Sequence, residues 1–428
     1  MKKINIAIVG LGTIGSYFYN FISKNKDVIS KKTNVIPNII YVCARNPKKK
    51  RLFKIPKKKW VKNYTDIVKD ENVDVVVELI GGSDGAAKDL VIKALLNKKH
   101  VVTANKALIA KHGDKLSKIA EEKKVNLEYE AAVCGGVPII RSIKEGLIAN
   151  KIQKVYGIFN GTSNYILSSM DQNKLQFKNV LIKAQRLGYA ENNPESDLNG
   201  EDVASKVQIL SSLSFNSFIN KNIHIEGIKN IDMDDILNAG KLGYKIKLLG
   251  FSELINNKIY QRVHPTLINK SSYIASINGV LNAVIVNGLP VGKSVIQGEG
   301  AGPSATTSAL ISDVSSILRG NIKYPFVISN KKRKKLHSGN ISKLSFSAYV
   351  RLDVKDKHGV LSNITKTFSR FKVSIKRLIQ NPAKSKKNSS IIIITHRALD
   401  FNLQKTLKIL SKKNYMIKKP KLIRIENN

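Results

Sequence analysis

The N-terminal residues carry the pattern that most restricts what this chain can fold into. Ile4–Val9 is a short, largely apolar run typical of a buried strand, and Gly10, Gly12 and Gly15 follow it with the spacing G-x-G-x-x-G. Between a strand and a helix, such glycines allow a tight turn, close approach of the backbone to a pyrophosphate and close helix–strand packing. Further strands are predicted at 39–44, 73–80 and 100–103. The sequence therefore predicts an N-terminal Rossmann domain that binds a dinucleotide.

The charges after the second predicted strand bear on the choice between NAD(H) and NADP(H). An NAD site normally has an acid there, which holds the ribose 2′-hydroxyl. This chain has no Asp or Glu between Val28 and Thr65, and Arg45 follows the strand with Lys48–Arg51 close behind. Positive charge at this place suits a 2′-phosphate. We therefore predict NADP(H) in preference to NAD(H), and Arg45 carries most of that inference.

A second unusual segment, Ala184 to Lys206, concentrates acids in a lysine-rich chain. The turn formers Asn193-Pro194 and Asn199-Gly200 predict that its first three acids lie on an ordered loop. Asn199 is predicted to cap a helix in which Asp202, three residues later, reaches back to the cap. Asp202 and Lys206 would then be neighbours on one helix face. They could form a surface ion pair of little energetic value, or an acid–lysine pair that exchanges protons with a substrate.

Composition limits the remaining function classes. The 428-residue chain has 73 Lys+Arg against 31 Asp+Glu, a formal net charge of +42. The lysines are scattered, so solvated lysine faces are favoured over nucleic-acid binding, although a cofactor-binding regulator that holds nucleic acid remains the alternative of another class. Two cysteines indicate no disulfide framework. No apolar run approaches the length of a membrane span, so a soluble, cytoplasmic protein without nucleic-acid or membrane partners is expected.

The motifs together resemble the homoserine dehydrogenases. The resemblance covers the whole chain: GLGTIG, VTANKALIA around Lys106, EAAVCGGVPII from Glu130, GIFNGTSNYIL from Gly157, the 184–206 signature, RVHPTLI from Arg262 and GEGAGPSATTSA from Gly298. It implies a Rossmann domain followed by an α+β substrate and dimerisation domain built on an open sheet. The implied reaction is the NAD(P)-dependent interconversion of L-homoserine and L-aspartate 4-semialdehyde, in the synthesis of threonine, methionine and isoleucine.

The resemblance also implies residue roles. Lys206 would be the proton donor and acceptor, with Asp202 its partner, and Lys106 would lie between cofactor and substrate. We expect burial, or Lys106 as a second cation, to lower the pKa of Lys206. Glu191 and Asp197 would bind the substrate. A monovalent cation, sodium or potassium, would be held by Glu130 and the backbone of Val133, Gly135 and Val137. The expected cofactor contacts are Gly10, Gly12, Thr13, Ile14, Gly15, Arg45, Thr103, Lys106, Gly300 and Gly302.

The domain boundaries are predicted at 1–130 for the Rossmann domain, 131–320 for the substrate domain, 321–344 for a basic linker and 345–428 for a last domain. In that domain, strands at 345–354, 373–379, 391–396 and 416–425 and helices at 359–371 and 402–410 give the ferredoxin-like order βαββαβ. It resembles an ACT domain, which implies a threonine effector and a homodimer or homotetramer. A dimerising module without a ligand is the alternative. The KKRKK run at 331–335 is predicted to be solvated.

Two residues suggest other chemistry. Cys134 could be a thiol nucleophile, as in aspartate-semialdehyde dehydrogenases, but no histidine lies near it in sequence, so a buried, inert thiol is favoured. His264 is predicted to be structural, since no His/Cys spacing indicates zinc.

Overall fold

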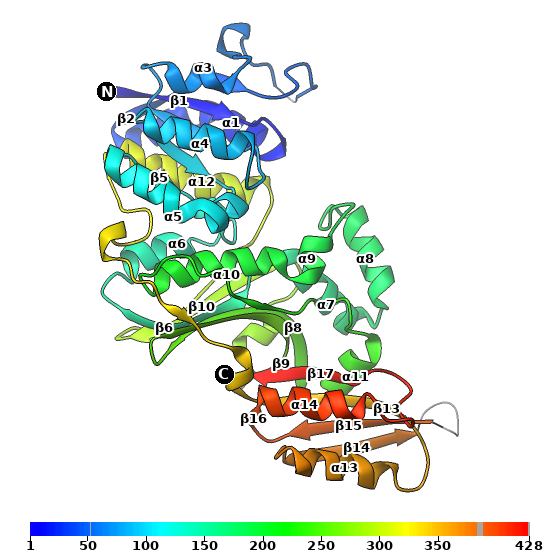
Figure 1. Ribbon diagram of the computed structural model, residues 1–428. Coiled ribbons are helices and arrows are strands. Elements are labelled where there is room, and N and C mark those ends of the chain that lie inside the picture. The colour runs from blue at the N-terminus through cyan, green and yellow to red at the C-terminus, as the bar shows by residue number, and fades with distance from the viewer. Residues whose placement is uncertain (52, 383–387, 427–428) are drawn as a thin grey trace.

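The N-terminal domain is built on a parallel five-stranded sheet with the order β2-β1-β3-β4-β5. The structure is a computed structural model that describes residues 1–51, 53–382 and 388–426 (Figure 1). The sheet strands are β1 (Lys2–Val9), β2 (Val35–Cys43), β3 (Val75–Glu78), β4 (His100–Thr103) and β5 (Leu127–Glu128). Each strand predicted for this domain is present. Helices α1 (Thr13–Lys24), α2 (Lys26–Thr33), α3 (Tyr64–Lys69), α4 (Ala86–Leu96) and α5 (Lys106–Lys123) connect them.

One helix of this domain comes from far along the chain. Helix α12 (Pro303–Leu318) packs beside α1, and its Leu310 and Val314 share one buried cluster with Ile6 and Phe18. Figure 1 shows α12 beneath the first sheet. The segment predicted as the substrate domain therefore returns at its end to the Rossmann domain, and the chain then passes back to the second domain, where His337–Ser338 pairs with the second sheet.

The second domain is a mixed sheet with helices on the face toward the first domain (Figure 1). Its strands are β6 (Lys151–Ile158), β7 (His224–Ile225), β8 (Tyr244–Ile255), β9 (Lys258–Asn269), β10 (Leu281–Leu289), β11 (Gly292–Glu299) and β12 (His337–Ser338). Its longer helices are α7 (Gly161–Asn173), α8 (Phe177–Arg186), α9 (Glu195–Asn199), α10 (Glu201–Ser214) and α11 (Met233–Lys241). Helix α10 is almost wholly buried because it packs on β8 and β9 and also against α5.

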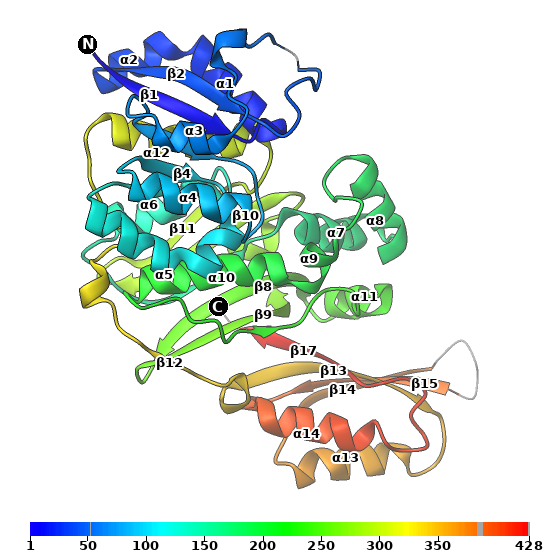
Figure 2. The same cartoon turned by 45° about the horizontal axis from the view of Figure 1, so that its top comes forward.

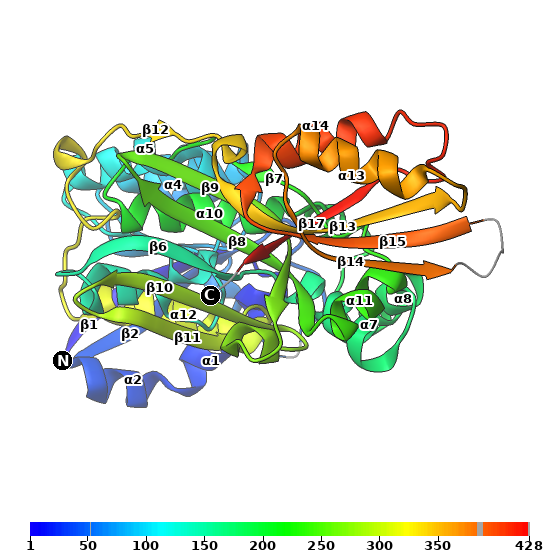
Figure 3. The same cartoon turned by 90° about the horizontal axis from the view of Figure 1, so that it is seen from below.

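The C-terminal domain has the predicted βαββαβ order. Its elements are β13 (Ser345–Lys355), α13 (Val360–Arg370), β14 (Ile375–Pro382), β15 (Asn388–Thr395), the short β16 (Ala398–Leu399), α14 (Asp400–Leu410) and β17 (Lys421–Glu426). The last strand begins later than the predicted residue 416, because Met416 makes only an isolated bridge with Val354 and Pro420, which lacks an N–H, precedes the strand. Strand β17 pairs with β13 and also with β9, and so joins the two sheets edge to edge (Figure 3).

The linker after α12 runs along the outside of α5 and α10 before it enters β13 (Figure 2). Its lysines at 331, 332, 334 and 335 are exposed, as predicted. Arg333 in their midst is buried, at 6% exposure, so the prediction of a wholly solvated linker is wrong at that residue. No helix within the described residues is long and apolar enough to cross a membrane.

Candidate active site

A buried carboxylate bridges two lysines at the contact between α5 and α10. Lys106, the first residue of α5, places its Nζ 2.8 Å from Asp202 Oδ1, and Lys206 Nζ lies 2.7 Å from Asp202 Oδ2. Asp202 and Lys206 are 5% and 7% exposed. The two lysines come from different domains, so the carboxylate closes the boundary between them. The pair Asp202–Lys206 is therefore no surface ion pair.

The turn into α10 differs from the predicted cap. Asn199 is the last residue of α9 rather than the cap of α10, and its Nδ2 donates to Glu195 Oε2. Gly200 joins the two helices with a φ of +88°, a left-handed conformation that glycine adopts without strain. The Asp202 carboxylate consequently points to the lysines and not to a cap. Glu195 and Asp197 lie within helix α9, so the prediction that they lie on a loop is also wrong.

Asn160 holds the acids of the cluster in place, and sequence reasoning missed it. Its Oδ1 accepts a hydrogen bond from Ser163 N and so caps α7. Its Nδ2 donates to Asp197 Oδ1 at 2.7 Å and to Asp202 Oδ2 at 2.9 Å. The signal available in the sequence was the Asn-Gly-Thr-Ser run after a strand, which is typical of a helix N-cap. Next to it, the carbonyl oxygen of Phe159 accepts a hydrogen bond from Lys206 Nζ at 2.6 Å.

The charges of the cluster set its protonation. Burial opposes the charge on Lys206, but Asp202 outweighs it and raises the pKa of this lysine above its usual value. The expectation of a lowered pKa is therefore wrong, because it left out the carboxylate. Burial likewise opposes the charge on Asp202, yet Lys206 and Lys106 together hold its pKa below the usual range. Burial and the charge of Asp202 raise the pKa of Asp197. Lys206 is thus an ammonium group near neutral pH and can donate a proton.

The proposed substrate acids differ in their surroundings. Asp197 is partly buried and faces Asn160 within the cluster. Glu191 is exposed, in the segment before α9, where its backbone oxygen accepts a hydrogen bond from Gln185 Nε2. The structure therefore brings Asp197 into the cluster, whereas the side chain of Glu191 lies at its surface.

The glycine turn after β1 has the geometry expected of a pyrophosphate site. A Cβ on Gly10 would lie 2.4 Å from the backbone of Leu79, and one on Gly15 would lie 2.0 Å from the Gly10 carbonyl oxygen. A Cβ on Gly12 would meet nothing within 4 Å, so this glycine faces open space. Helix α1 begins at Thr13 and directs its first N–H groups toward the turn.

The other expected cofactor residues surround the same region. Arg45 is exposed just after β2, and Gly302, with a φ of +106°, precedes the N-terminus of α12 and faces open space. Gly300 is packed instead, since a Cβ there would lie 2.1 Å from the side chain of Asn282. Thr103 is buried and its hydroxyl donates to Glu78 Oε2 at 2.6 Å, so this side chain ties β4 to β3.

Comparison with known proteins identifies the chain. Its residues 10–130 match the NAD binding domain of homoserine dehydrogenase, 138–315 match the homoserine dehydrogenase model, and 348–413 match the ACT domain. The chain is 37% identical to homoserine dehydrogenases of Neisseria gonorrhoeae and Helicobacter pylori, over all of its own length and 99% and 100% of theirs. A crystal structure of the enzyme from Thiobacillus denitrificans is 35% identical, with a TM-score of 0.93 over 100% of this chain and 99% of that one.

The chain belongs to the homoserine dehydrogenase family. It is an oxidoreductase of amino-acid biosynthesis that interconverts L-aspartate 4-semialdehyde and L-homoserine with a nicotinamide nucleotide. The predicted fold class is confirmed, with a Rossmann domain, a mixed-sheet domain and a C-terminal ACT domain.

Cys134 of this homoserine dehydrogenase is unsuited to nucleophilic attack. The thiol is buried, and burial raises its pKa to about 11. Because the thiolate is the nucleophile, a thiol with so high a pKa is inert near neutral pH. His264 is also buried, and burial together with Arg424 and Arg262 lowers its pKa well below the usual value. It therefore stays neutral, stacked on Phe251.

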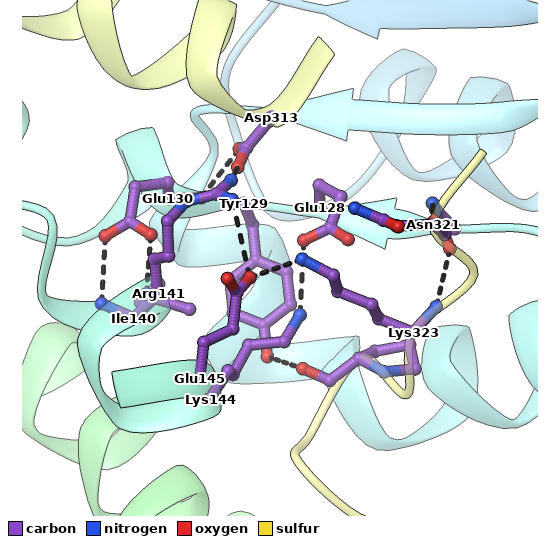
Figure 4. A network of polar contacts seen from close by, with 12 residues as sticks. Glu128, Tyr129, Glu130, Ile140, Arg141, Lys144, Glu145, Asp313, Asn321 and Lys323 are labelled. Atoms are coloured by element: carbon purple, nitrogen blue, oxygen red, sulfur yellow. Dashed lines mark hydrogen bonds and ion pairs between the residues drawn. The ribbon is translucent and has the colours of Figure 1, made fainter. Parts of the chain in front are cut away.

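The predicted cation residues lie where the chain first passes between the domains. The Glu130 carboxylate accepts hydrogen bonds from the backbone of Ile140 at 2.9 Å and Arg141 at 2.7 Å, and the Glu130 N–H donates to Asp313 on α12 (Figure 4). Burial raises the pKa of Glu130 to about 7. The backbone at 133–137 packs against 299–301, and a Cβ on Gly135 would lie 2.7 Å from the Gly300 carbonyl oxygen.

Proposed function

We propose that Lys206 moves the proton in the homoserine dehydrogenase reaction and that NADP(H) is the preferred nucleotide. The observation that supports the first part is the cluster of buried Lys206 and Asp202 with half-exposed Lys106 at the contact between the nucleotide domain and the substrate domain. A bound nicotinamide supplies the hydride. Hydride arriving at an aldehyde carbon leaves an alkoxide oxygen that must be protonated, so an acid has to lie beside it.

Each side chain of the cluster has a separate role in the proposed mechanism. Lys206, kept as an ammonium by Asp202, donates a proton to the alkoxide oxygen during reduction. In oxidation it must first lose that proton and then take one from the hydroxyl of homoserine. Asn160 and the Phe159 carbonyl oxygen hold the pair Asp202–Lys206 in one geometry. Lys106, whose side chain is 41% exposed, would face both cofactor and substrate.

The substrate's ammonium group needs carboxylates, and Asp197 and Glu191 are the acids that we assign to it. Asp197 Oδ1 accepts a hydrogen bond from Asn160 Nδ2 at 2.7 Å, which holds this carboxylate beside Asp202 and Lys206. Its raised pKa indicates a buried carboxylate without enough positive charge nearby, which an incoming ammonium would supply.

The NADP(H) preference rests on Arg45, which is exposed at the end of β2 in a segment without acids. Replacing Arg45 with alanine is expected to raise the KM for NADPH roughly tenfold, because a hydrogen bond to a charged group is lost. The KM for NADH should change little. Steady-state kinetics with both nucleotides measure the two constants, and Arg370→Ala, an exposed arginine on α13, is the control. An equal effect on both nucleotides would contradict the assignment.

We also propose a sodium or potassium ion at Glu130 with the backbone of Val133, Gly135 and Val137. A carboxylate with carbonyl oxygens is the kind of donor set that hard cations take. Burial raises the pKa of Glu130 although two backbone N–H groups stabilise its charged form, and a bound cation would supply the positive charge that the buried carboxylate needs. The ion would brace the passage between the domains and take no part in proton transfer.

The proposal also covers regulation by an effector and assembly into an oligomer. We assign a threonine effector to the ACT domain, at the turn 356–361, where Gly359 has a φ of +81° and precedes α13. A homodimer or homotetramer in the cytoplasm, serving threonine, methionine and isoleucine synthesis, follows from the family resemblance.

One series of assays tests the proposed reaction, nucleotide preference, effector and cation. Purified protein should oxidise NADPH in the presence of aspartate semialdehyde, and NADH more slowly. Added threonine should slow the reaction, and sodium or potassium should raise the melting temperature relative to a tetramethylammonium buffer, because an ion that binds the folded state stabilises it. No turnover with either nucleotide would contradict the function, whereas indifference to threonine or to the ions would contradict only the corresponding site.

A further inference from the structure

One buried arginine of the basic linker binds both helices that carry the catalytic lysines. Arg333 is 6% exposed as a whole residue, and its side chain is fully buried. Its guanidinium donates to Asp114 Oδ1 on α5 at 2.6 Å and to Ser212 Oγ on α10 at 2.9 Å. It also donates to the carbonyl oxygen of Ser217 at 2.8 Å. The planar, multiply donating guanidinium suits such a junction, because its geometry fixes several acceptors at once.

Aromatic rings confine the guanidinium between the domains. The Phe326 ring centroid lies 4.2 Å from Arg333 Cζ, and that of Phe218 lies 4.7 Å from it. The neighbouring backbone is fixed as well, since Phe218 N donates to the Lys334 carbonyl oxygen at 3.0 Å. Asn330, three residues earlier, donates to Glu121 near the end of α5. The linker is thus attached to both helices around this one side chain.

The two helices that Arg333 contacts also carry the active-site residues, so Arg333 can affect the geometry of that site. Asp114 lies eight residues after Lys106 on α5, about 12 Å along a rigid helix. Ser212 is on the helix that carries Asp202 and Lys206. A change in the relative position of α5 and α10 at Arg333 would therefore change the distance between Lys106 and Asp202, which is now 2.8 Å.

We propose that Arg333 is a positioning residue for the dehydrogenase reaction: it fixes α5 against α10 and so keeps Lys106 in register with Asp202. The inference rests on the roles proposed above for Lys106 and Asp202. It also gives the linker a function, because the segment that leads into the ACT domain then holds the two catalytic helices together.

A double-mutant cycle between Arg333 and Lys106 tests the proposal. Arg333→Met is expected to lower kcat/KM for homoserine roughly 10- to 100-fold by misplacement, with the dissociation constant for NADPH unchanged. Lys106→Ala should then have a smaller effect in the Arg333→Met background than in the wild type, by at least about threefold. A purely structural role for Arg333 would give additive effects, because the two residues do not touch. All assays are run well below the melting temperature of each variant.

Arg351→Met is the matched control. Arg351 is also buried, at 2% exposure, and pairs with Asp232 at the junction with the ACT domain. We expect its loss to lower the melting temperature and to leave the effect of Lys106→Ala unchanged. Arg333→Lys should recover part of the activity. If Arg333→Met does not fold, Asp114→Asn, which removes the charged acceptor, takes its place in the cycle.

The outcomes distinguish the proposed role of Lys106 from the positioning role of Arg333. Full activity of Lys106→Ala alone would remove the role assigned to Lys106 and this inference with it. A large loss in Lys106→Ala that is additive with Arg333→Met would overturn the inference and leave the site intact.

Discussion

Replacing Lys206 with alanine is expected to lower kcat in both directions by roughly 10²–10⁴-fold, the usual contribution of a positioned general acid or base. The substitution removes the only ammonium that both Asp202 and the Phe159 carbonyl oxygen hold among the described residues. NADPH should bind with an unchanged dissociation constant, because the glycine turn lies in the other domain. Stopped-flow NADPH oxidation and fluorescence titration measure the two quantities.

Two further variants separate proton transfer from electrostatics. Lys206→Arg keeps the positive charge, but a guanidinium does not release its proton at working pH, so we expect it to be nearly as inactive as the alanine variant. Lys118→Ala breaks an exposed i,i+4 pair with Glu122 and should leave kcat unchanged. Substantial activity in Lys206→Arg would mean that the residue supplies only charge.

Much of the fold could be predicted from patterns of residues that are adjacent in sequence. Strand β4 has the predicted bounds, and Gly10 and Gly15 lie where a side chain would collide with backbone, because a strand–turn–helix unit is determined by residues adjacent in sequence. The ferredoxin-like order of the last domain could be predicted for the same reason, since its strands and helices follow one another along the sequence. Its assignment as an ACT domain came from the resemblance. These elements are determined by neighbouring residues, so the local sequence is enough to predict them.

The contacts that complete the active site depend on residues distant in sequence. Asn160 interacts with Asp202 across 42 positions, and Arg333 with Asp114 across 219. No local pattern predicts such pairs. The cap prediction at Asn199 was wrong because Asn199 ends one helix and only Gly200 separates it from the next, an arrangement that residue propensities do not distinguish from a loop. The pKa of Lys206 was predicted in the wrong direction because burial was considered without the charge of Asp202.

Replacing Asp202 with asparagine is expected to cause the second-largest loss of kcat. It should also shift the pH dependence of kcat. The change leaves Lys206 and Lys106 without the carboxylate that bridges them, and breaking a buried ion pair in this way costs about 3–5 kcal/mol of folding stability. We expect a loss of about 10²-fold in kcat, since Lys206 is no longer aligned. Thermal unfolding and steady-state kinetics report the two changes.

The sign of the pH shift follows from the causes of the lysine's pKa. In the native protein burial opposes the charge on Lys206, and the charge of Asp202 outweighs it and raises the pKa of this lysine. Without that charge, burial and the nearby Lys106 ammonium both lower the pKa. Reduction requires protonated Lys206, so its rate falls as pH rises through this pKa. The alkaline limb of the reductive kcat profile should therefore move to lower pH in Asp202→Asn.

Asp84→Asn is the control for this shift, because Asp84 pairs with Lys111 and His112 at the surface of α5 and does not contact Lys206. Its alkaline limb should coincide with that of the wild type. In the oxidative direction Asp202→Asn should reach its plateau at a lower pH than the wild type, because neutral Lys206 forms sooner. An unshifted limb in both directions would show that Lys206 is not the group whose protonation controls the rate, whatever the loss in kcat.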